Sequence, residues 1–86
     1  MIVHVGSILH SYTGGRSDVE AEGGTVGAVL DDLERKFPGF KFRIVDEQDE
    51  IRPHIKVYVG TKQVRRLGSK VAPADELHIL QALSGG

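Results

Sequence analysis

The sequence contains no cysteine. This absence excludes a disulfide framework, a thiolate metal site, an iron–sulfur cluster and a catalytic thiol. The chain also lacks a run of about 18 apolar residues, and no charged and then apolar leader opens it. We therefore expect no membrane partner and no secretory signal, and a cytoplasmic setting.

The sequence has no excess of charge of either sign. Eleven lysines and arginines stand against twelve aspartates and glutamates, which gives a net charge of -1. Binding to phosphate backbones relies on a strongly basic field, so nucleic acid is not expected as a partner. The 86 residues are 40% hydrophobic and 27% charged. This length and composition predict one folded domain with a single core.

Two strands are predicted before the first helix. Residues 2–9 alternate with period two, which predicts a strand with Val3, Val5 and Leu9 on its buried face and His4 and Ile8 on the other. Gly14 and Gly15 supply the positive φ angles of a two-residue hairpin loop. Residues 17–22 alternate again, with Val19 and Ala21 inward, and predict a second, antiparallel strand.

One helix is predicted from Thr25, as its N-cap, to about Phe37. Apolar residues at spacings of three and four form a stripe that faces the core: Val26, Val29, Leu30, Leu33 and Phe37. The acidic residues Asp31, Asp32 and Glu34 are expected on the exposed side, and Pro38-Gly39 ends the helix.

The second half of the chain predicts three further strands. Residues 40–45 fit either a short strand or a helical turn, and the acidic residues 46–50 an exposed loop. Residues 54–60 alternate clearly, residues 63–65 form a short edge segment, and the last strand places Leu77 and Ile79 inward with His78 and Leu80 outward.

This order predicts an α+β fold of the β-grasp, or ubiquitin-like, type. A mixed sheet of four to five strands carries one main helix on one face, and the first and last strands lie parallel at its centre. Residues 1–82 form the β-grasp domain, and residues 83–86 a flexible tail that ends in Gly-Gly.

Four segments together resemble the ubiquitin-like sulfur carriers of the MoaD, ThiS and CysO family. They are "TVGAVLDDLERKFPG" at the helix, "RPHIKVYVG" at the third strand, "APADELHIL" before the last strand and the terminal "SGG". The resemblance covers essentially the whole chain. The stretch "SILHSYTGGRSDVEAEGGTVGAVLDDLE" looks most like CysO and the MoaD proteins close to it.

The resemblance implies a carrier and not an enzyme. An ATP-dependent adenylyltransferase related to ubiquitin-activating enzymes would adenylate the carboxylate of Gly86, and sulfur would then replace AMP to give a thiocarboxylate. The sulfur would pass to an acceptor enzyme, either a cysteine synthase or the large subunit of molybdopterin synthase. Gly85, Ser84 and Leu83 form the rest of the tail. ATP belongs to the activating partner, and no cofactor is expected on the chain itself.

Physical chemistry explains why such a tail ends in glycines. A terminal carboxylate is ionised at neutral pH and is a poor electrophile until it is activated. A tail that enters an enclosed activating site must be thin and free of Cβ constraints. Residues 82–86 would reach on the order of 17 Å when extended. Two alternatives remain open: a protein modifier joined through Gly86 to lysines, and a β-grasp interaction domain whose tail is idle.

Two surfaces are candidates for partner docking. The sheet face away from the helix is expected to carry Leu80, His78, Tyr58 and Lys56, a mixed apolar and basic patch beside the tail. The segment "KQVRRLGSK" offers Lys62, Arg65, Arg66 and Lys70 to an acidic partner, although a solvated edge is the more ordinary interpretation.

No metal or phosphate site is predicted. The sequence shows neither an i,i+4 helical pair nor an acidic ligand cluster near His4, His10, His54 and His78, so ordinary surface or strand positions are expected. Residues 46–50 lack the spaced ligands and central glycine of a calcium loop. The two Gly-Gly pairs lack the lysine and hydroxyl residues of a phosphate loop, and we interpret them as turns.

Overall fold

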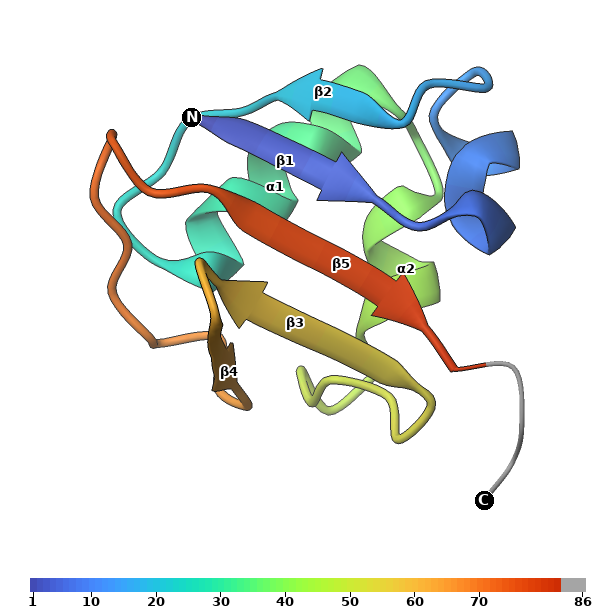
Figure 1. Ribbon diagram of the computed structural model, residues 1–86. Coiled ribbons are helices and arrows are strands. Elements are labelled where there is room, and N and C mark those ends of the chain that lie inside the picture. Colours follow the sequence, from blue (N-terminus) through green and yellow to red (C-terminus); the bar gives the residue numbers. More distant parts are fainter. Residues whose placement is uncertain (83–86) are drawn as a thin grey trace.

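A five-stranded sheet forms one layer of the protein, and two helices cover one of its faces (Figure 1). The structure is a computed structural model that describes residues 1–82. The elements are, in chain order, β1 (Ile2–Val5), the 3-10 helix η1 (Ser7–Tyr12), β2 (Asp18–Glu20), α1 (Val26–Lys36), α2 (Phe40–Ile44), β3 (Ile55–Val59), β4 (Lys62–Val64) and β5 (Leu77–Gln81).

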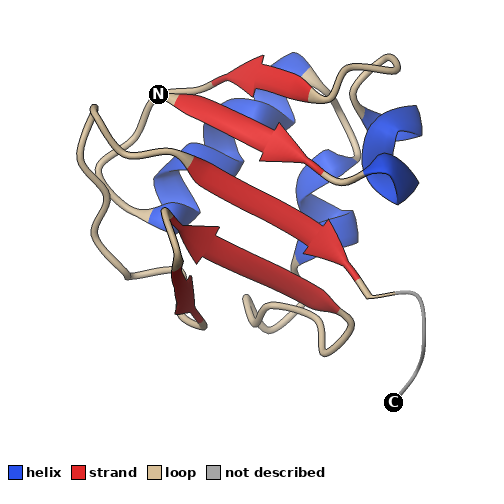
Figure 2. Ribbon diagram, viewed as in Figure 1, coloured by secondary structure: helices blue, strands red, loops and turns tan. Residues whose placement is uncertain are grey.

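The strands lie in the order β2-β1-β5-β3-β4, so the last strand of the chain is the central one (Figure 2). β1 and β5 are parallel, with Val3 opposite Leu77 and Val5 opposite Ile79. The remaining pairs are antiparallel. The predicted mixed sheet, with its first and last strands parallel at the centre and its main helix on one face, is confirmed.

The core lies between the sheet and the helices. The alternating residues of the strands and the apolar stripe of α1 meet there, as the sequence predicted. Several core side chains have no exposed surface, among them Val3, Val57, Leu77 and Ile79 of the sheet and Leu30 of α1. Burying each such side chain contributes about 1.5–3 kcal/mol relative to leaving it in water. None of the helices within residues 1–82 could span a bilayer.

The prediction of a strand over residues 2–9 is wrong beyond Val5. The amide of Gly6 donates to the carbonyl of Ile79 (2.9 Å), and the chain then turns into η1. Leu9 is buried from this helix and Ile8 is exposed, which fits the period-two pattern although no strand continues there. η1 lies within the connection from β1 to β2, so the predicted two-residue hairpin loop is also wrong.

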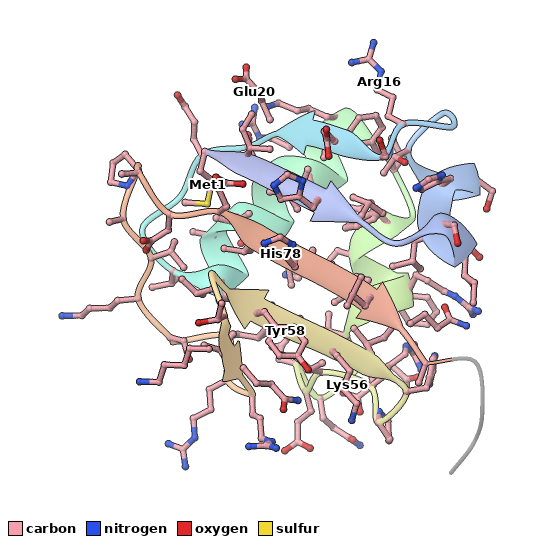
Figure 3. All side chains as sticks on the ribbon, viewed as in Figure 1. Met1, Arg16, Glu20, Lys56, Tyr58 and His78 are labelled. Carbon is pink, nitrogen blue, oxygen red and sulfur yellow. The ribbon has the colours of Figure 1, made fainter. Side chains whose placement is uncertain are left out.

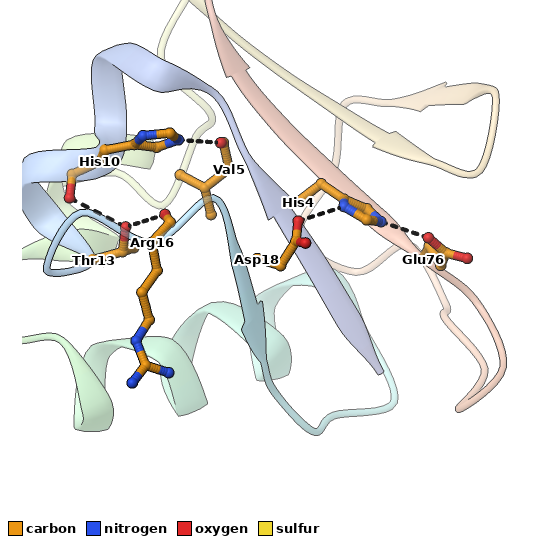
Figure 4. Close-up of polar contacts among 7 residues, drawn as sticks. All are labelled: His4, Val5, His10, Thr13, Arg16, Asp18 and Glu76. Atoms are coloured by element: carbon orange, nitrogen blue, oxygen red, sulfur yellow. Dashed lines mark hydrogen bonds and ion pairs between the residues drawn. The ribbon is translucent and has the colours of Figure 1, made fainter.

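The Gly14-Gly15 turn closes the connection between η1 and β2. Both glycines have the expected positive φ angles, 65° and 85°. The buried Thr13 hydroxyl is within hydrogen-bond distance of the carbonyls of His10 (3.3 Å) and Arg16 (2.8 Å), and the His10 ring contacts the Val5 carbonyl (2.9 Å; Figure 4). These contacts fix η1 beside the end of β1.

α1 begins and ends where the sequence predicted. The Thr25 hydroxyl accepts a hydrogen bond from the amide of Ala28 (3.1 Å), which satisfies one donor of the first turn. At the other end, Arg35 and Lys36 lie in the last turn, where cations interact favourably with the helix dipole.

Thr25→Ala removes this cap and should lower the free energy of unfolding by about 1 kcal/mol. For a domain of this size the melting temperature should then fall by roughly 4–8 °C. Urea denaturation measures the change directly. Thr25→Ser is the matched control, because it keeps the hydroxyl and should retain most of the stability. Equal losses in both variants would contradict a capping role.

Asp32 is buried, contrary to the expectation that it lies on the exposed side of the helix; only 7% of its surface is exposed. Its carboxylate accepts the amide of Glu22 (3.0 Å) and pairs with Lys36 (3.0 Å) and with Arg35. The hydrogen bond from Lys36 and then that from the Glu22 amide hold the pKa of Asp32 below its ordinary value. Asp32 thus ties α1 to the segment that follows β2.

Asp32 should make stability depend on pH in the acid range. Its folded pKa is lowered, so its contribution is complete above the unfolded value of about 3.9 and is lost as the pH falls through the lower folded value. The melting temperature of Asp32→Asn should lie below that of the unchanged protein at neutral pH, and the difference should shrink at low pH. Glu47, an exposed acid of the loop 46–50, changed to Gln, is the control; a difference independent of pH would contradict the assignment.

The ambiguous residues 40–45 contain a short helix. Gly39 takes a positive φ of 96° between α1 and α2. The Glu34 carboxylate accepts the amides of Gly39 and Lys41, each at 2.9 Å, and these two bonds lower the pKa of Glu34. Residues 46–50 form the expected loop, which the Asp46 side chain closes by accepting the amides of Gln48 and Glu50.

Candidate functional site

The outer face of the sheet brings together the four predicted docking residues of β3 and β5. Lys56 lies opposite Leu80, and Tyr58 lies opposite His78. His78, Tyr58 and Lys56 follow one another in this order across the face turned away from the helices (Figure 3). Leu80 is 42% exposed, and the other three are partly exposed. The sequence placed these side chains on the correct face.

The apolar part of this face lies where β5 meets η1. A Cβ on Gly6 would come within 3.2 Å of a Leu80 methyl carbon, so Leu80 lies close over the Gly6 backbone. Ile8 of η1 is 38% exposed. The alternation of residues 2–9 predicted an outward position for Ile8 but no docking role, because η1 was not foreseen. At the end of β5 the amide of Ala82 donates to the His54 carbonyl (2.8 Å), which fixes the point where the chain leaves the sheet.

The opposite part of the face carries a histidine between two carboxylates. His4 Nδ1 lies 2.8 Å from an Asp18 oxygen, and its Nε2 lies 2.5 Å from a Glu76 oxygen (Figure 4). The His4 and His78 rings stack with their centroids 4.6 Å apart. The hydrogen bonds to Glu76 and then to Asp18 raise the pKa of His4. The expectation that the histidines have no acidic residues near them is therefore wrong for His4 and His78.

The basic segment after β3 lines one open groove at the edge of the sheet. Lys62, Arg65, Arg66 and Lys70 all contribute to it, together with Val59 of β3. A second hollow is lined by both Lys56 and Arg65. Arg65 lines both hollows, so the basic edge comes close to Lys56 of the outer face.

The predicted reactive residue, Gly86, lies outside the described residues, as do Gly85, Ser84 and Leu83. The described part of the chain leads to them from β5, the central strand. The outer face, formed by Lys56, Tyr58, His78 and Leu80, is thus built on the same strand and its neighbour β3.

The order of strands, with α1 packed on one face of a mixed sheet, defines a β-grasp, ubiquitin-like domain. The family model described as the ThiS family matches residues 3–86. The chain therefore belongs to the ThiS family.

Similar proteins match over nearly their whole length. The chain is 36% identical to the sulfur carrier protein CysO of Mycobacterium tuberculosis, over 98% of this chain and 96% of that protein. The crystal structure of the BexX/CysO complex of Amycolatopsis orientalis contains a chain with a TM-score of 0.92 and 40% identity, covering 99% of this chain and 98% of that one. The crystal structure of SAMP1 from Haloferax volcanii matches with a TM-score of 0.78 and 31% identity, covering 100% of this chain and 98% of that one.

Proposed function

We propose that this protein carries sulfur as a thiocarboxylate on Gly86. A partner enzyme joins the Gly86 carboxylate to AMP from ATP and releases pyrophosphate. A sulfur nucleophile then displaces AMP, and the resulting thiocarboxylate donates its sulfur to an acceptor enzyme. In this account the protein is a carrier and substrate, and the partners supply the catalysis.

The observation that carries the proposal is similarity that runs through the tail. The ThiS-family match extends to residue 86, so it includes both terminal glycines. The relatives with the name sulfur carrier protein CysO are matched over 96% of their own length. The fold adds a physical reason, because the tail follows directly in sequence on the central strand β5, and β5 carries part of an exposed face that is partly apolar and partly basic.

The outer face and the basic edge are proposed as the docking surface for the activating enzyme. Leu80 supplies exposed apolar area, and Lys56, Arg65 and Arg66 supply positive charge along the two hollows. Apolar anchors give affinity, whereas charges steer the encounter with an acidic partner. The complex of CysO with BexX shows a relative bound to a protein partner. For the acceptor we propose a cysteine synthase, with the large subunit of molybdopterin synthase as the alternative.

Intact-mass spectrometry tests the proposal. The protein is incubated with its genome's own adenylating enzyme, ATP and a sulfide source. The mass should rise by the difference between one sulfur and one oxygen atom, and only when ATP is present. Adding each acceptor enzyme with its substrate should consume the thiocarboxylate with one acceptor and not the other, first as an acyl adduct of the acceptor product on Gly86 and then, once water hydrolyses that bond, as the original mass. An unchanged mass with an activating enzyme that modifies a related carrier would contradict the proposal.

A second function, conjugation to proteins, is favoured by the small archaeal modifier proteins among the structural relatives. One of them, from Methanosarcina acetivorans, matches with a TM-score of 0.83 and 26% identity. Conjugation starts from the same adenylate, which a lysine amine attacks in place of sulfur. Immunoblots of cell lysate should then show high-mass adducts that contain an isopeptide bond to Gly86. A lysate with the single, unconjugated species alone would favour the carrier function.

A further inference from the structure

The side chains around His4 on the outer face of the sheet have no chemical role in the proposed sulfur transfer. His4 comes from β1, His78 from β5 and Glu76 from the segment just before β5. Each offers a ligand atom, and these atoms lie within 4.8 Å of one another. From these residues we infer a binding site for one divalent zinc ion, with His4, His78 and Glu76 as protein ligands.

The chemistry of the three ligand atoms suits zinc. Zinc binds imidazole nitrogen at about 2.0–2.1 Å and carboxylate oxygen at about 2.0–2.2 Å. Two histidines, one glutamate and a solvent molecule make a four-coordinate site of mixed nitrogen and oxygen ligands. Magnesium and calcium prefer all-oxygen sites, so they should bind here far more weakly.

Asp18 orients the His4 ring for metal binding. Its carboxylate lies 2.8 Å from His4 Nδ1 and can accept that N–H, so that Nε2, which faces Glu76, is the nitrogen that can bind zinc once its proton is displaced. A carboxylate on the far nitrogen of a zinc-binding histidine fixes the tautomer and the orientation of the ring. Asp18 therefore acts as a positioning residue, although it lies on a different strand, β2.

Zinc binding requires the side chains to rotate, because the His4 and His78 rings are stacked with 17° between their planes and must turn before one nitrogen of each points at the same ion. Tetrahedral zinc would hold neighbouring ligand atoms about 3.4 Å apart, given bonds of about 2.1 Å. His4 Nε2 and the Glu76 oxygen are closer than this, at 2.5 Å, and would separate as zinc replaces the proton between them. The backbone already places His4 and His78 directly opposite each other on paired strands. Because Glu76 is 58% exposed and His4 33% exposed, the side chains have room to rotate.

Zinc chloride titrated into the protein without an affinity tag tests this inference, with binding followed by competition against a coloured zinc chelator. The unchanged protein should bind one equivalent. Asp18→Ala should weaken binding by about 10–100-fold, as the loss of a carboxylate behind a ligating histidine usually does. His78→Gln and Glu76→Gln should weaken it at least as much. His54→Gln is the matched control and should bind like the unchanged protein.

Nuclear magnetic resonance of the unchanged protein gives a test that does not depend on the folding of variants. Zinc should shift the ring nitrogens of His4 and His78, and leave those of His10 and His54 in place. The inference is overturned if the unchanged protein binds no zinc, if His78→Gln binds as well as the control variant, or if the shifts fall on the acidic loop of residues 46–50.

Discussion

Deletion of Gly86 should abolish activation and leave the fold intact. The deletion withdraws the carboxylate by one residue, about 3.3–3.6 Å, from the position at which the partner enzyme attacks it. Misplacement of a reacting group by about 1 Å already costs about 100-fold in rate, so the loss here should be at least that large. Formation of the adenylate is measured by the exchange of labelled pyrophosphate into ATP.

Two further variants sharpen this result. One alanine added after Gly86 should also abolish exchange, because it moves the carboxylate forward. Ser84→Ala keeps both the length and the terminal carboxylate and should retain nearly full exchange. The three variants should melt at the same temperature as the unchanged protein, since the last strand, β5, ends at Gln81 and every change comes later in the sequence. Exchange that survives the deletion would rule out Gly86 as the site of activation.

Leu80→Glu should weaken binding to the activating enzyme by roughly 30-fold, which corresponds to about 2 kcal/mol for a central apolar contact. The change removes exposed apolar area and places a negative charge on the surface proposed to meet an acidic partner. Stability should change little, because Leu80 is 42% exposed and Lys56 lies directly opposite to pair with the new carboxylate. Isothermal titration calorimetry with the activating enzyme measures the effect.

Phe42→Glu is the matched control for this variant. Phe42 is 61% exposed and belongs to α2, on the helical layer behind the sheet (Figure 1). Like Leu80, it has a basic neighbour, because the Arg52 guanidinium lies 4.8 Å from the centre of its ring. Glutamate at position 42 should leave binding unchanged. Equal weakening by both variants would show a general effect of charge and not a docking surface.

The sequence predicted those elements whose local pattern and tertiary contacts agree. The stripe of α1, its Thr25 cap and the alternation of β3 and β5 each depend on residues a few positions apart, and they appear as expected. The prediction of the first strand was wrong from Gly6 onward. η1 buries Leu9 just as an extended strand would, so the alternating pattern could not distinguish the two. The prediction that Asp32 is exposed was wrong because its partners include the amide of Glu22, ten positions away, and no helical pattern reveals such a contact.

The candidate surfaces were predictable only where they depend on local alternation, and not where they depend on contacts between distant residues. Strand alternation alone predicts that one face of the sheet carries Lys56, Tyr58, His78 and Leu80. The contact of His4 with Glu76 joins residues 72 positions apart and depends on the parallel pairing of β1 with β5. The sequence indicated that pairing but not its register, and the register decides that His4 lies opposite His78.

Tandem mass spectrometry of the activated protein tests the central claim most directly. After incubation with the activating enzyme, ATP and sulfide, the C-terminal peptide is isolated and fragmented. The account predicts that the added sulfur lies in the terminal fragment that contains Gly86, and that an alkylating reagent caps it at that residue. Sulfur on any internal residue, or an activated protein whose C-terminal peptide is unchanged, would contradict the account.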